Sequence, residues 1–191
     1  GDRAAASGIV SGEKNVAVGH YSMYALTTGA YNTALGANTL SSNTTASNNI
    51  AVGYNALLSN TTGGNNVAIG FEALKSNTTA DNNNAVGMKA ITTNTIGNYN
   101  DAFGYSALEK NTTGTCNVAV GFKALEENTT GTYNTAVGYE ALTANNGSTG
   151  QYNTAVGSQA LDANTTGRVN TAVGASTLTS NTTGDKNTAV G

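Results

Sequence analysis

The sequence predicts an all-β fold, a parallel β-solenoid (a β-roll or β-helix) of about eleven coils of 17 residues each. Three observations predict it. A short motif recurs at a nearly constant spacing, each place in the repeat accepts only a few chemically similar residues, and short apolar runs alternate with turns rich in Asn, Thr and Gly.

The repeat begins with an asparagine in the motif Asn-x-Ala-Val-Gly. This motif starts at Asn15, Asn32, Asn49, Asn66, Asn83, Asn100, Asn117, Asn134, Asn153, Asn170 and Asn187. The spacing is 17 residues except for one step of 19, between Asn134 and Asn153, where a two-residue insertion falls near 145–150. We therefore divide the chain into a partial or atypical first coil, 1–14, and a tandem array, 15–191, which we expect to be part of a longer fibre.

The consensus unit is Asn-Thr-Ala-Val-Gly-Tyr-x-Ala-Leu-x-x-Asn-Thr-Thr-Gly-x-x, and we number its positions 1 to 17 from the motif asparagine. Such a unit is too short for the helix pairs of α-solenoids, whose repeats run to roughly 33 residues or more. It fits one β-coil, stacked on the next at about 4.8 Å. Stacking turns each position into a ladder of like side chains, which explains the uniform columns. The Gly or Ala at position 15 indicates a turn that needs positive φ or a close backbone approach.

Small and large apolar residues are neighbours in the repeat, as Ala and Val at positions 3 and 4, and as Ala and Leu at positions 8 and 9. Neighbours on a strand point to opposite faces. We expect the small residues to face the interior of the coil and the larger ones to pack on another chain. A column of aromatic residues after the motif glycine adds to this expectation: Tyr54, Phe71, Tyr105, Phe122 and Tyr139. A homotrimer is the leading hypothesis, beside a head-to-tail filament and a solenoid of one chain.

The composition excludes several classes of partner. The net charge is −3 and only 10% of residues are charged, so no basic stripe is available for nucleic acid. No apolar run approaches the roughly 20 residues needed to cross a bilayer, so we expect no membrane insertion in this segment. Cys116 is the only cysteine, which rules out an intrachain disulfide or a cysteine-based metal cluster.

The motifs Asn-Val-Ala-Val-Gly at 15–19 and 117–121, Asn-Val-Ala-Ile-Gly at 66–70 and Asn-Thr-Ala-Val-Gly at 134–138 resemble the head repeats of YadA-like trimeric autotransporter adhesins. The arrays are also similar to shaft segments of phage tail fibres. The resemblance implies a left-handed parallel β-roll, a homotrimer, and an extracellular, cell-surface or virion location. The adhesin head unit is shorter than 17 residues, and this chain adds an Asn-Thr-Thr-Gly turn to it.

The sequence predicts no catalytic, cofactor or metal site. His20 is the only histidine, so a zinc site would lack the further ligands that it needs. No serine or cysteine has a neighbouring histidine or lysine that recommends a nucleophile and base pair. The acidic residues are interpreted as a solvated face: Glu72, Glu109, Glu126, Glu127, Glu140 and Asp162. We therefore do not expect an enzyme.

The asparagine at position 12 supports two interpretations. Glycosylation sequons begin at Asn43, Asn60, Asn77, Asn111, Asn128, Asn146, Asn164 and Asn181. If they carry sugars, the chain is a glycan-coated fibre of an exported protein. Alternatively, Asn-Thr-Thr-Gly is turn chemistry, with amides that bond along a ladder. Asn94 favours the ladder, because it keeps the asparagine while Thr95 and Ile96 break the sequon.

The function that we expect is a structural shaft of an extracellular fibre or adhesin, a stiff filament for attachment or surface coating, with a host-surface ligand as a further partner. The alternative is a binding module for ice or carbohydrate that uses the regular Thr or aromatic ladders. The Thr pair at positions 13 and 14 is a poor ice-binding pattern, because adjacent residues on a strand diverge.

Overall fold

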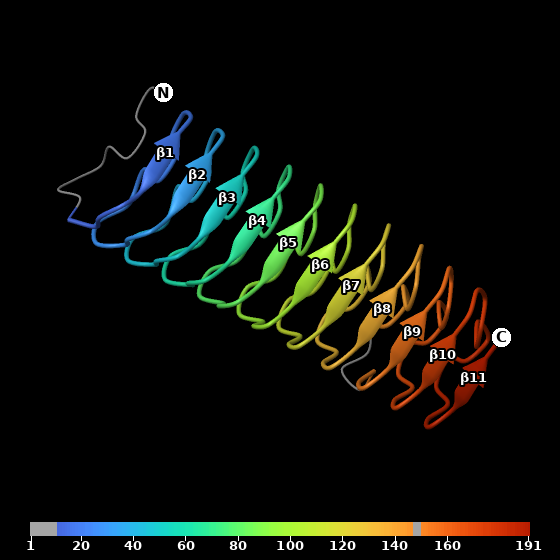
Figure 1. Cartoon of the computed structure of the whole chain (residues 1–191). Helices are drawn as coiled ribbons and strands as arrows, with labels where there is room; N and C mark the ends of the chain where they lie inside the picture. Colours follow the sequence, from blue (N-terminus) through green and yellow to red (C-terminus); the bar gives the residue numbers. More distant parts are fainter. Residues whose placement is uncertain (1–10, 147–149) are drawn as a thin grey trace.

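The computed structural model describes residues 11–146 and 150–191 of the chain. In this part the fold is all-β, and it contains one parallel sheet whose 11 strands follow chain order (Figure 1). The strands are β1 (Val16–Val18), β2 (Thr33–Leu35), β3 (Ile50–Val52), β4 (Val67–Ile69), β5 (Asn84–Val86), β6 (Asp101–Phe103), β7 (Val118–Val120), β8 (Thr135–Val137), β9 (Thr154–Val156), β10 (Thr171–Val173) and β11 (Thr188–Val190). The predicted β-solenoid is confirmed. The predicted segment 1–14 falls mostly outside the described residues.

The strands pair without any shift of register, so that equal positions of the repeat lie beside each other. Ala85 pairs with Ala102, for example, one repeat further along the chain. The step of 19 residues keeps this register, because Thr135 of β8 still pairs with Thr154 of β9. The two additional residues therefore fall between Asn145 and Gly150, where the Asn145 side chain still bonds to Asn128 and to Gly150.

The turns that follow each strand are stacked as regularly as the strands. At position 9 the Leu74 amide donates to the Ala90 carbonyl of the next coil at 3.0 Å, and at position 13 the Thr78 amide donates to the Thr95 carbonyl at 3.1 Å. Backbone hydrogen bonds thus connect the coils on more than one side of the rod. With ten steps of about 4.8 Å, the array is roughly 48 Å long.

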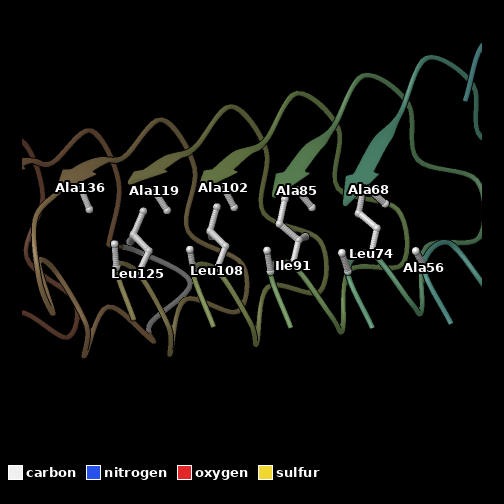
Figure 2. Close-up of a cluster of buried hydrophobic side chains, with 14 of the residues drawn as sticks. Ala56, Ala68, Leu74, Ala85, Ile91, Ala102, Leu108, Ala119, Leu125 and Ala136 are labelled. Atoms are coloured by element: carbon white, nitrogen blue, oxygen red, sulfur yellow. The ribbon is translucent and has the colours of Figure 1, made fainter. Parts of the chain in front are cut away.

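The interior contains apolar columns from two walls of the coil that face each other. Alanines of the strands and leucines of the opposite wall point toward one another, as Ala102 and Leu108 do in Figure 2. Ala85, Ala90 and Ile91 represent positions 3, 8 and 9 of one coil, and each is 0% exposed. The prediction that the small residues face the interior is confirmed.

The larger apolar residues at position 4 face outward, as we expected. Our expectation was wrong for those at position 9, which face the interior. At position 4 the side chains face outward, as with Phe103 at 43% exposure. At position 9 they are inside, as with Leu108 at 0%. The reason is that Ala107 and Leu108 lie in a turn, where Leu108 has a φ of 53°. The alternation that holds along a strand does not hold there, so both neighbours enter the core.

Positive φ angles occur at positions 5, 7, 9 and 17 of the repeat, and not at position 15, where the sequence suggested one. The glycine at position 5 has a left-handed φ in every coil, 121° at Gly53 and 134° at Gly121. Position 15 has no positive φ, but the close backbone approach predicted there is found, because a Cβ on Gly97 would clash with the Gly114 carbonyl oxygen of the next coil. Ordinary residues adopt left-handed φ at positions 7, 9 and 17, so each coil holds conformations that cost L-residues roughly 1–2 kcal/mol.

Val169→Asn is expected to stabilise the chain by about 1 kcal/mol. Val169 is β-branched and has a φ of 58°, whereas Asn48 and Asn65 occupy the same position with φ angles of 63° and 58°. Asparagine tolerates this conformation better than valine does. The thermal midpoint measures the gain. Thr113→Asn, at an exposed turn position without positive φ, is the control, and an equal rise in both variants would contradict the explanation.

Candidate functional site

The asparagines at position 12 form a buried ladder inside the rod. The Asn77 Nδ2 donates to the Asn60 Oδ1 at 2.9 Å, and the Asn94 Nδ2 donates to the Asn77 Oδ1 at 3.0 Å. These side chains are 0% exposed. Each amide also donates to the position-15 carbonyl of its own coil, as from Asn94 to Gly97 at 2.9 Å. The ladder therefore provides hydrogen-bond partners for buried amide groups, which would lower the stability of the fold if they were left without partners.

The motif asparagines at position 1 form a second ladder. Asn117 donates to the Asn100 Oδ1 through its backbone N at 3.2 Å and through Nδ2 at 3.1 Å. The same Nδ2 donates to the Gly131 carbonyl at 2.9 Å, which also accepts from the Asn128 Nδ2 at 3.2 Å. In this coil one carbonyl thus accepts from both ladders, whereas the Asn83 Nδ2 donates instead to the Asp81 carbonyl at 3.2 Å.

The structure places most sequon asparagines where a glycan has no room. Their Nδ2 atoms, which would carry the sugar, point into the ladder and donate hydrogen bonds there. The side chains with 0% exposure are Asn43, Asn60, Asn77, Asn111, Asn128 and Asn164. Asn181 is half-buried in the last coil. Asn146 is exposed, but its sequon extends to 147 and 148, outside the described residues. Because Asn94 makes the same bonds without a sequon, the column is explained by the ladder.

The threonines at positions 13 and 14 diverge. At position 13 the hydroxyl donates to the next coil, as from Thr61 to the Thr78 carbonyl and from Thr78 to the Thr95 carbonyl, both at 3.0 Å. At position 14 Thr62 and Thr79 are exposed. The Thr pair therefore presents one exposed rank of threonines, which does not favour ice binding by this turn.

An apolar surface follows positions 4 and 6 along the rod. Position 4 holds Val, Leu, Ile or Phe in each coil, and Val120 is still 36% exposed. At position 6 the rings stack in parallel: Tyr105 on Phe122 at 5.2 Å between centroids, and Phe122 on Tyr139 at 5.3 Å. Stacked rings cover each other's faces, so this column presents mainly ring edges. That geometry disfavours stacking of sugars on it.

Many of the charged residues lie on a different edge, at positions 7, 10 and 11, and most of those are paired. The ion pairs are Glu72–Lys75 at 2.7 Å, Lys89–Glu109 at 3.6 Å, Lys110–Glu127 at 2.7 Å and Lys123–Glu126 at 3.3 Å. The hydrogen bond from Lys75 lowers the pKa of Glu72, and the hydrogen bond to Glu127 raises the pKa of Lys110. This edge is a solvated surface with its charges largely balanced.

Glu72→Gln is expected to lower stability at pH 7 by about 0.3–0.5 kcal/mol, as is typical of exposed pairs. Because the pKa of Glu72 is lowered in the fold, its contribution is present above the ordinary value of 4.5 and is lost as the pH falls through the folded value. The difference in thermal midpoint between wild type and variant should therefore close in acid. A difference that persists at strongly acid pH would contradict this assignment.

His20 is the only histidine of the chain, and its surroundings are simple. His20 is exposed and meets the Tyr21 ring edge-on at 4.1 Å. Along 11–146 and 150–191 the structure shows no ligand-sized pocket and no group of three or more His, Cys, Asp or Glu side chains placed to hold a metal. No helix in these ranges is both long and apolar enough to span a bilayer.

The fold and these ladders define a repetitive parallel β-solenoid protein. Comparison with known protein families, with curated proteins and with solved structures found no match to the chain.

A third set of asparagines, at position 17, was missed by the sequence analysis. Asn48 and Asn65 are exposed and Asn82 is half-buried. The column looked variable because tyrosines, Tyr31 and Tyr99, stand before and after the three asparagines, and other residue types occupy position 17 in later coils. The signal in the sequence was three successive repeats that end in asparagine, between two repeats that end in tyrosine.

Proposed function

We propose that the chain is a structural shaft of an extracellular fibre or adhesin. The observation that carries the proposal is the regular stacking of the described coils, with backbone ladders in both strands and turns and two amide ladders inside. A linear array of this kind derives its stability from contacts between neighbouring coils, and it can be extended by adding coils. The proposed role is mechanical and includes no catalytic step.

The partner that we propose is a second and a third copy of the same chain. The apolar surface of positions 4 and 6 supports this, because Phe103 is 43% exposed and Phe122 is 40% exposed. Contiguous exposed apolar surface of this extent is typical of association sites. The resemblance to trimeric adhesin heads and tail-fibre shafts supports both the homotrimer and a cell-surface or virion location.

The mass in solution, measured by analytical ultracentrifugation with electron microscopy of the same sample, tests the proposal. We expect straight rods of trimeric mass. Val120→Glu should shift the mass to that of one chain, because it places a carboxylate in the apolar surface. Thr113→Glu, on the exposed turn at position 14, is the matched control. Single chains at all concentrations would overturn the trimer, and compact particles would overturn the shaft.

A further inference from the structure

Five successive coils carry a polar row at position 17, bounded by tyrosines. The row is Tyr31, Asn48, Asn65, Asn82 and Tyr99, all with φ between 58° and 63°. Tyr31 is 54% exposed and Tyr99 is 60% exposed. With coils spaced by about 4.8 Å, the two tyrosines are roughly 19 Å apart.

The amides of this row are uncommitted, unlike those of the two buried ladders. Within the part of the chain that the structure describes, the side chains of Asn48, Asn65 and Asn82 make no hydrogen bond. Their backbone amides are held, as from Asn48 to the Ala30 carbonyl at 3.0 Å and from Asn82 to the Gly64 carbonyl at 3.1 Å. Asn48 and Asn65 therefore present two donors and an acceptor each to solvent from a fixed backbone, and Asn82 does so in part.

The two tyrosines differ from the others in this column. Tyr133 and Tyr152 stack on each other with centroids 5.0 Å apart and planes 2° apart, so each covers a face of the other. Tyr99 has Asn82 and Cys116 as its column neighbours, and no ring stacks on it among the described contacts. Tyr31 has the Lys14 ammonium 5.0 Å from its ring centroid and Asn48 as its other neighbour. At both ends of the row, an exposed ring adjoins free amides.

Backbone conformation alone does not explain the asparagines. Asparagine is favoured at left-handed φ, but the same position with the same φ holds Cys116, Val169 and Lys186 in other coils. Further polar groups adjoin the row at position 16. The Asp81 Oδ1 accepts from the Gly64 amide at 2.6 Å, and the Asn98 Oδ1 accepts from the Asp81 amide at 2.7 Å. A second carboxylate oxygen and an amide NH₂ remain beside the row.

We propose that this row binds an extended neutral polysaccharide of the β-1,4-linked glucan type, lying along the rod. An exposed aromatic ring offers an apolar face to the C–H face of a sugar. Amides arranged in a straight line suit the hydroxyl pairs of a linear chain. The net charge of −3 and the adjoining Asp81 disfavour an anionic polysaccharide. The site lies outside positions 4 and 6, so it does not depend on the proposed self-association.

Isothermal titration with cellohexaose and sedimentation with microcrystalline cellulose or chitin test the inference. We expect wild type to bind, Tyr99→Ala to weaken binding about tenfold by losing a stacking face, and Asn65→Gly to weaken it about fivefold. Glycine retains the left-handed backbone at position 65 while removing the amide.

Tyr133→Ala is the matched control, because Tyr133 is 52% exposed in the same column but outside the row. It should leave binding unchanged. The inference is overturned if wild type does not bind these glycans, if Tyr133→Ala weakens binding as much as Tyr99→Ala, or if only an anionic polysaccharide such as alginate is bound. Circular dichroism establishes that each variant is folded. Electron microscopy tests the shaft separately, so that failure of one proposal is distinguishable from failure of the other.

Discussion

Asn117→Asp is expected to lower the free energy of unfolding at pH 7 by about 3–5 kcal/mol, the cost of an uncompensated buried charge. The substitution preserves the shape of the side chain but replaces its donor NH₂ with a charged carboxylate oxygen. The Asn117 Nδ2 donates to the Asn100 Oδ1 and to the Gly131 carbonyl, so the new carboxylate would face two acceptors. The other half of the ladder is retained, because the Asn117 Oδ1 accepts from the Asn134 amide at 3.0 Å.

The pH dependence identifies the cause. Burial and the two facing acceptors should raise the pKa of the new carboxyl in the fold, since only its protonated form can donate. The stabilising protonation is present at low pH and is lost as the pH rises through the folded pKa. The thermal midpoint of the variant should therefore approach that of wild type as the pH is lowered from 7 to 4.

Asn65→Asp makes the same substitution at an exposed side chain without a hydrogen bond, and it should cost less than about 0.5 kcal/mol. If both variants lose equal stability, or if the loss at position 117 is independent of pH, the amide ladder does not hold the coil as described. Amide hydrogen exchange would show whether the loss is confined to the coils around Asn117, as expected for a linear array.

The fold was predictable because stacking imposes the same demand on each coil. When Ala85 lies on Ala102 and Asn94 on Asn77, a change in one coil disturbs two neighbours, so the columns stay uniform and the period is visible. The burial of alanine at position 3 followed from strand alternation. The burial of leucine at position 9 did not, because it depends on the left-handed φ of residues such as Leu108.

The sequons show that one sequence pattern can be typical of two different features, a glycosylation site and a hydrogen-bonded turn. Asn-Thr-Thr is both a glycan acceptor and a turn whose amide and hydroxyl bond to neighbouring coils. Asn94, which keeps the ladder after the sequon is lost, was the informative residue in the sequence. The polar row at position 17 was hidden for another reason. Its significance depends on knowing that Asn65 is exposed and unbonded while Asn66, the next residue, is 0% exposed and bonded within the ladder.

Gly53→Ala is expected to destabilise the chain by about 3–5 kcal/mol, because two effects act at one atom. Gly53 has a φ of 121°, a conformation that L-residues rarely adopt. A Cβ at this position would lie 2.6 Å from the Gly70 carbonyl oxygen and 2.8 Å from its carbon. The neighbouring atoms belong to the backbone of the next coil, which Gly70 ties to Val52 through a hydrogen bond of 2.8 Å. The clash cannot be relieved by rotating a side chain.

Gly64→Ala, at position 16 of the same coil, distinguishes this requirement from a general preference for small residues. Its Cβ would lie 3.1 Å from the Ser47 carbonyl oxygen, no left-handed φ is involved, and Ala30 occupies the same position in another coil. We expect a change below about 1 kcal/mol, measured by thermal unfolding beside Gly53→Ala. Equal losses would mean that the rod tolerates no added methyl in either turn. A large loss at Gly53 alone would show that position 5 sets the spacing of the coils, which is why glycine occupies it in each repeat while position 15 accepts alanine.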